Sequence, residues 1–185
     1  MKKLLLVTAI AVFGFSANAQ DDEKVSTSKF GAKAGFNSTS LRVSFDGTSA
    51  SESVSGFYLG VFGEFMVSEK FDIQPELQYV SVSEDGENSG FLLIPVLAKY
   101  NATEDLSILA GPQFDYLLDD EDGGLNRLGF GIAAGLAYNI DENFVIDARY
   151  SLGLSNRTTD GIEELEGFDF KTTFNYVQIG LGYKF

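Results

Sequence analysis

The chain has 185 residues, with 13 Lys and Arg against 27 Asp and Glu, a formal charge of −14, and no Cys, His or Trp. This length fits one domain of ordinary size or at most two small ones. Without cysteine there are no disulfides, thiolate metal sites or cysteine nucleophiles, and without histidine the commonest general base is missing. The acidic balance argues against nucleic acid as a partner, because phosphates are bound by clustered Lys and Arg.

The chain opens with the pattern of a cleaved export signal. Lys2 and Lys3 form a basic start, an apolar run covers residues 4–15, and Ala17 and Ala19 form an A-x-A cleavage pattern. This run is too short to cross about 30 Å of hydrocarbon as a helix. We therefore expect a signal peptide over 1–19, a short N-terminal segment over 20–28 and one folded domain over 29–185.

The rest of the chain alternates apolar and polar residues with a period of two, which predicts β-strands rather than helices. β-branched and aromatic residues dominate the apolar positions, as is typical of strands. No stretch between them has a convincing helical period. The sequence therefore predicts an all-β protein with eight strands, whose apolar rows lie at residues 30–36, 57–65, 71–79, 92–100, 106–116, 128–138, 144–152 and 177–185.

Long and short connections alternate between these strands. In an antiparallel meander, alternate connections lie at the same end of the sheet, so one end is expected to be tight and the other to carry the long loops. Eight strands in this order can close into a barrel without a free edge. The expected long loops are 40–55, 83–89, 119–126 and 155–171, and the short turns are 68–70, 103–105 and 141–143.

Two kinds of eight-stranded barrel fit the alternation. A lipocalin-like barrel turns its apolar face inward around a ligand, whereas a membrane barrel turns it outward to lipid. Opposite the apolar row of 128–138 the chain carries mainly Gly and Ala, which suit a crowded interior, and opposite that of 71–79 it carries carboxylates and amides. Strands of about ten or eleven residues span roughly 25 Å when they are tilted by about 40°, and this is the height of the lipid-facing band. The sequence therefore favours an eight-stranded antiparallel up-and-down transmembrane β-barrel.

Charged residues of both signs fall on the inward rows of this barrel. Opposite charges are expected to pair there, because an unpaired charge in a narrow lumen is costly. Two of these carboxylates could in principle catalyse hydrolysis, but without histidine one of them would have to act as the general base. We prefer the interpretation that the charges form structural ion pairs, so no catalytic residue is assigned. The expected lumen network is Glu64, Asp72, Glu76, Lys99, Asp147 and Arg149, with Lys33 and Asp115 on the same inward faces.

An acidic run formed by Asp119, Asp120, Glu121 and Asp122 lies in one expected long loop. Its spacing does not match a calcium-binding loop. We expect a solvated, repulsive surface, and weak bridging by divalent cations to lipopolysaccharide or to a neighbouring protein is the alternative. No metal or cofactor is assigned.

Four short stretches are spread over the folded region: 56–60 (GFYLG), 93–100 (LIPVLAKY), 147–154 (DARYSLGL) and 180–185 (GLGYKF). In these stretches, their order and their spacing the chain resembles the PorT-like outer-membrane β-barrel family, the "porin family", of the Bacteroidetes. The resemblance implies a small barrel in the outer membrane of a Gram-negative bacterium, with periplasmic termini and extracellular long loops. The family label does not imply pore activity.

These observations lead to an expected function without enzymatic activity. We expect a barrel with a packed polar lumen and acidic loops that has a structural or surface-interaction role. Its expected partners are outer-membrane lipid, lipopolysaccharide and the outer-membrane insertion machinery, which would recognise the terminal aromatics Tyr183 and Phe185. A narrow passive pore for small solutes is the first alternative, and a secreted lipocalin-like binder of apolar ligands is the second.

Overall fold

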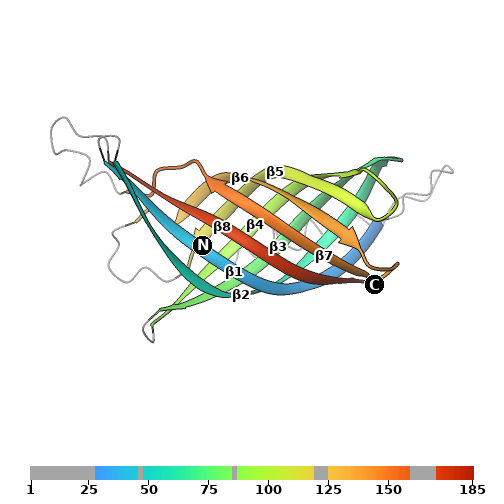
Figure 1. Ribbon diagram of the computed structural model, residues 1–185, viewed down its shortest axis with the longest axis horizontal. Helices are drawn as coiled ribbons and strands as arrows, with labels where there is room; N and C mark the ends of the chain where they lie inside the picture. Colours follow the sequence, from blue (N-terminus) through green and yellow to red (C-terminus); the bar gives the residue numbers. More distant parts are fainter. Residues whose placement is uncertain (1–27, 46–47, 85–86, 119–124, 159–169) are drawn as a thin grey trace, which may run out of the picture.

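The computed structural model describes residues 28–45, 48–84, 87–118, 125–158 and 170–185, which form a closed barrel of eight antiparallel strands (Figure 1). Each strand pairs with its neighbours in sequence, and the first closes on the last. The predicted fold class is confirmed. The strands are β1 Ser28–Phe45, β2 Thr48–Ser68, β3 Phe71–Glu84, β4 Glu87–Asn101, β5 Leu106–Leu117, β6 Leu128–Asn139, β7 Phe144–Gly153 and β8 Phe170–Lys184.

The expected signal peptide over 1–19 and most of the expected segment 20–28 lie outside the described residues. Ser28 already belongs to β1, where it is the register partner of Phe65. Among the described residues, no helix combines the length and hydropathy of a membrane span.

The apolar rows of the strands point outward. Phe57, Leu59, Leu136 and Ile179 expose 73%, 65%, 52% and 51% of their surface, whereas the residues between them in the sequence face the lumen. In β7 the alternation is nearly regular over the whole strand. A sheet with this orientation presents a continuous apolar surface around the outside of the barrel, as a transmembrane barrel requires and a lipocalin-like barrel does not.

Two of the expected long loops are strand extensions, so their predicted bounds were wrong. β1 continues to Phe45 and β2 begins at Thr48, with Leu41 opposite Glu52 in the ladder. Similarly, β3 continues to Glu84 and β4 begins at Glu87. In the β1 extension the alternation continues, but its apolar residues, such as Leu41, lie on the inward row instead of the outward one. The β2 extension is mainly Ser over residues 49–55 and carries no apolar row from which a strand could be recognised in the sequence. Figure 1 shows the β1–β2 and β3–β4 extensions diverging at the same end of the barrel.

The opposite end is tight, as predicted, and the C-terminus lies there (Figure 1). The β6–β7 turn is held by Asp141, whose Oδ1 accepts hydrogen bonds from the backbone N–H groups of Phe144 at 2.6 Å and Asn143 at 2.8 Å. These two bonds hold the pKa of Asp141 below its usual value, because they stabilise the ionised carboxylate.

Candidate functional site in the barrel lumen

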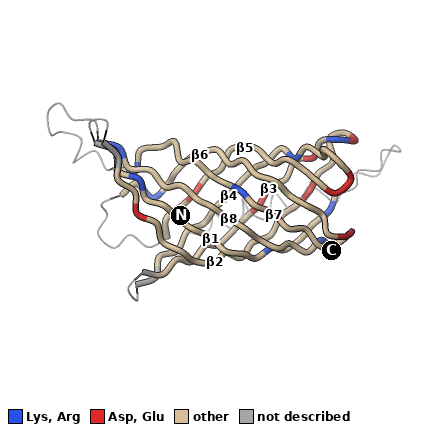
Figure 2. Tube along the Cα trace, viewed as in Figure 1, with Lys and Arg blue, Asp and Glu red and all other residues tan. Residues whose placement is uncertain are grey.

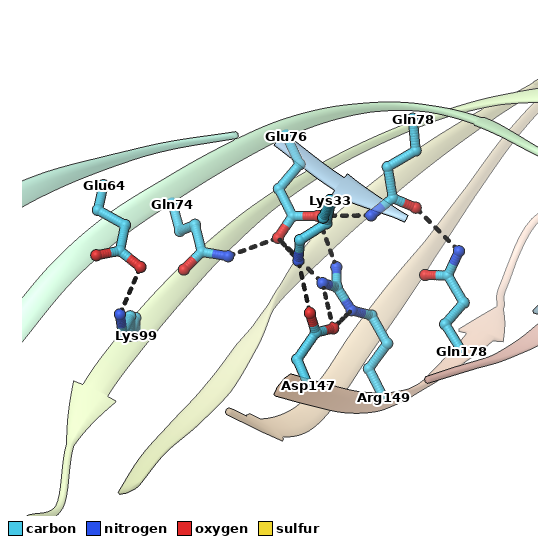
Figure 3. Close-up of polar contacts among 9 residues, drawn as sticks. All are labelled: Lys33, Glu64, Gln74, Glu76, Gln78, Lys99, Asp147, Arg149 and Gln178. Carbon is cyan, nitrogen blue, oxygen red and sulfur yellow. Dashed lines mark hydrogen bonds and ion pairs between the residues drawn. The ribbon is translucent and has the colours of Figure 1, made fainter. Parts of the chain in front are cut away.

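Four charged side chains form an ion cage in the centre of the lumen (Figure 3). Arg149 places Nη1 3.0 Å from Glu76 Oε2 and Nη2 2.8 Å from Asp147 Oδ1. Lys33 places Nζ 3.2 Å from Glu76 Oε1 and 2.9 Å from Asp147 Oδ2. The side chains of Glu76 and Arg149 are fully buried. With two cations and two carboxylates, the ion cage is formally neutral, which offsets the cost of burying each charge.

Amide side chains complete the hydrogen bonding around Glu76. Gln74 Nε2 donates to Glu76 Oε1 and Gln78 Nε2 donates to Glu76 Oε2, each at 2.6 Å. Gln178 Nε2 in turn donates to Gln78 Oε1 at 2.9 Å, which extends the network to β8 (Figure 3). Together with the ion cage, these groups cross the lumen and occupy its centre.

The sequence positions these groups by strand periodicity and by glycine. Glu76 and its two amide neighbours are successive inward residues of β3, and Asp147 and Arg149 are successive inward residues of β7. Gly135 of β6 lies opposite Arg149, and Gly180 of β8 lies opposite Asp147. A Cβ atom at Gly135 would overlap the backbone carbonyl of Ala148 and the Arg149 side chain, so this close approach requires glycine.

A second polar group lies nearer the tight end. Lys99 Nζ is 2.6 Å from Glu64 Oε1, and Asn101 Nδ2 donates to Asp72 Oδ2 at 2.9 Å. Asp72 is the ladder partner of Lys99. Other inward positions beside this group and the ion cage are held by an apolar cluster of Phe62, Leu97, Leu109, Ala133, Ala137 and Val145.

The expected lumen network therefore divides into two sets. Glu76, Asp147 and Arg149 meet in the ion cage, which also includes Lys33. Glu64, Asp72 and Lys99 lie inside the barrel but belong to the separate group near the tight end. Figure 2 shows the resulting pattern, with charged residues gathered at the two ends of the barrel and a few in its centre.

One ion pair was missed because it involves a residue of an expected loop. Arg157 turns into the lumen from the segment after β7, and its Nη2 lies 2.9 Å from Asp115 Oδ2. Its guanidinium also stacks on Phe174, 5.1 Å from the ring centroid. Gly129 provides the space, since a Cβ there would overlap both Arg157 and Asp115. No periodicity marks Arg157, so the sequence offered no signal for it.

The lumen is also less polar than expected. Above the ion cage, toward the end with the strand extensions, its inward residues form a largely apolar cluster that we call the outer lumen cluster. The strands β2, β3 and β4 carry apolar residues on both faces in this region, so alternation does not reveal which of them point inward. The outer lumen cluster consists of Tyr58, Val80, Val82, Phe91, Leu93, Leu117, Phe174 and Tyr176.

The terminal aromatics lie on the outside of the barrel at its tight end. Tyr183 packs against Phe144 with a ring-centroid distance of 5.1 Å and against Phe185 at 5.7 Å. Phe185 exposes 78% of its surface, while its backbone N–H donates to the carbonyl of Phe30 at 2.9 Å.

The acidic residues Asp119, Asp120, Glu121 and Asp122 lie outside the described part of the chain. Within the described ranges, no group of three or more carboxylates is placed to hold a metal ion.

An outward apolar surface around a lumen filled by ion pairs defines a transmembrane β-barrel with a closed centre. The profile of the outer membrane protein β-barrel domain matches residues 18–159, and the chain belongs to this family. It is therefore a small barrel of the bacterial outer membrane. No curated protein sequence matches the chain.

Among solved structures, the chain is similar to the attachment invasion locus protein Ail of Yersinia pestis, with 19% identity over 85% of this chain and 98% of Ail and a TM-score of 0.49. It is similar to OprG of Pseudomonas aeruginosa, with 16% identity over 89% of this chain and 99% of OprG and a TM-score of 0.49. It is also similar to Neisserial surface protein A, with 16% identity over 84% of this chain and 97% of that protein and a TM-score of 0.47. None of the three carries a function over to this chain.

Proposed function

We propose that this protein is a closed outer-membrane barrel with a structural or surface-interaction role and without enzymatic activity. The observation that carries the proposal is the neutral ion cage, in which Lys33, Glu76, Asp147 and Arg149 link β1, β3 and β7 across the lumen. The ion cage stabilises the barrel from inside and leaves the loop end as the part of the molecule that can meet partners.

The proposed origin and orientation follow from the resemblance. We infer a PorT-like barrel of a Gram-negative member of the Bacteroidetes, exported by a signal peptide over 1–19 and with both termini in the periplasm. The tight end then faces the periplasm, and the strand extensions lie on the extracellular side. The acidic run 119–122 would lie on the extracellular side, where lipopolysaccharide and surface partners are found.

The conductance of the purified protein tests the proposal against the narrow-pore alternative. An eight-stranded barrel encloses only enough space for side chains to fill, whereas water-filled porins need about sixteen strands. We therefore expect no steady open channel in planar lipid bilayers, and at most brief small events. A stable, ion-selective conductance from the unmodified protein would contradict the closed barrel and establish the pore.

Deletion of Phe185 tests the proposed recognition by the insertion machinery. The exposed ring lies on the lipid face beside Tyr183, while the backbone of Phe185 hydrogen-bonds to β1, so it can serve both assembly and barrel closure. We expect the deletion to lower the amount of protein in the outer membrane more than it lowers the stability of protein refolded in detergent. Cell fractionation and urea unfolding measure the two effects, with Phe185→Tyr as the control that keeps an aromatic end. Equal losses in both would leave a structural role alone.

A further inference from the structure

The outer lumen cluster does not fill the lumen to its end. Above it, the described residues of β1 to β5 and β8, with Leu125, line a cavity of about 300 Å³ that they leave partly open on the side of the strand extensions. Apolar side chains make up most of the cavity wall. They include Leu41, Val54, Val82, Phe91, Leu117 and Phe174.

The cavity is closed below. Tyr58 of β2 is only 3% exposed, and its ring passes Gly35 of β1 to bring its hydroxyl against Gly180 of β8. Beneath it, Gln78 and Gln178 are fully buried and hydrogen-bonded to each other across the lumen. A molecule that enters from the loop end therefore meets a floor of tyrosine, amides and the ion cage.

The polar groups around the cavity define what it can hold. The buried charges Arg157 and Asp115 do not line the cavity, and they balance each other in an ion pair at 2.9 Å. Thr39 lines the wall, where its Oγ1 accepts a hydrogen bond from Asn37 Nδ2 at 2.8 Å and its own proton can be donated to one polar group. Ser89 adds a second hydroxyl to the lining, and Glu52 lies at the exposed rim.

Binding of an apolar ligand removes the apolar side chains of the cavity from water, which lowers the free energy of the system. The cavity is open on one side, so it is a concavity at the end of the lumen and not an internal packing void. Its volume is at the lower end of the range of small-molecule sites, about 300–1,000 Å³. We propose that the outer lumen is a blind binding site for a small, uncharged, largely apolar molecule that carries a hydrogen-bonding group.

The test uses the protein in phosphatidylcholine nanodiscs, with methyl groups of Leu and Val labelled for NMR and 4-fluorobenzyl alcohol as the probe. We expect saturable shift changes at the methyls of Leu41, Val54 and Leu117. The outward Leu59 and Leu136 report partition of the probe into lipid, and their shifts should change linearly without saturation. If the cavity methyls show no saturable change, or follow the outward methyls, the proposed site does not exist.

Substitutions that fill the cavity give a second readout. Leu41→Trp places an indole in the cavity, while Ser40→Trp on the opposite face of the same strand is its matched control. Val54→Trp and Ser53→Trp repeat the comparison from β2. We expect both filling variants to weaken probe binding by roughly tenfold or more, and both controls to bind as the unmodified protein does. Unchanged binding in the two filling variants would overturn the proposal. If either variant fails to fold, the methyl NMR titration of the unmodified protein decides whether the site exists.

Discussion

Arg149→Ala is expected to lower the free energy of unfolding by about 3–5 kcal/mol, the cost of removing one partner from a buried ion pair. Arg149 contacts both Glu76 and Asp147, and its side chain is fully buried. Without it, Lys33 is left to balance two carboxylates in a space that excludes water. Urea unfolding in detergent micelles or lipid vesicles measures the loss, and the same variant is expected to show intermittent conductance in planar bilayers.

A surface substitution gives the baseline for this loss, and two further variants separate the effect of charge from that of lost volume. Lys171→Ala, at an exposed position of β8, should cost less than about 1 kcal/mol, as is usual for surface charges. Arg149→Met leaves the ion cage with one excess negative charge, whereas Arg149→Met combined with Asp147→Asn restores neutrality around Lys33 and Glu76. We expect the double variant to be more stable than Arg149→Met alone. If it is less stable, or if Arg149→Ala costs no more than Lys171→Ala, the ion cage does not hold the barrel together.

Leu136→Arg is expected to cost about 2–4 kcal/mol of folding free energy if the outward face meets the hydrocarbon interior, because charge on the lipid face is most costly near the midplane. Leu136 is 52% exposed on β6, and Ile179 on β8 is equally exposed, so Ile179→Arg should have a similar effect. Urea unfolding in lipid vesicles measures both changes.

Leu128→Arg is the matched control, since Leu128 lies on the same face at the loop end of β6 and is 65% exposed. Near the interface the expected cost is only about 0–1 kcal/mol. Because the chain contains no cysteine, Leu136→Cys and Ile179→Cys can be labelled singly, and a water-soluble maleimide should react with them slowly in bilayers. Rapid labelling of both, or equal costs at Leu128 and Leu136, would show that this surface does not face lipid.

The sequence by itself determined the number of strands and their order, and it favoured an outward direction for the main apolar rows. The period of two is a direct consequence of strand geometry. A face rich in Gly and Ala suits the crowded interior of a narrow barrel, whereas a solvent-exposed face would normally carry charged residues. Asp72, Glu76, Asp147 and Arg149 were placed inside the barrel by the same periodicity. The strand extensions were missed, because the apolar residues of the β1 extension, such as Leu41, lie on the inward row, and the β2 extension around Ser51 and Ser53 carries no apolar row.

Only the tertiary structure decided which inward residues meet. Lys33, Glu76 and Asp147 come from β1, β3 and β7, and their distances depend on barrel closure and on the stagger between strands, which periodicity does not encode. The ion pair of Arg157 with Asp115 also depends on the tertiary structure, because the chain after β7 turns back into the lumen. The apolar outer lumen was likewise hidden, because a Val or Phe on an inward row has the same side chain as one on an outward row, and only the closed barrel determines which of them faces lipid and which encloses a cavity.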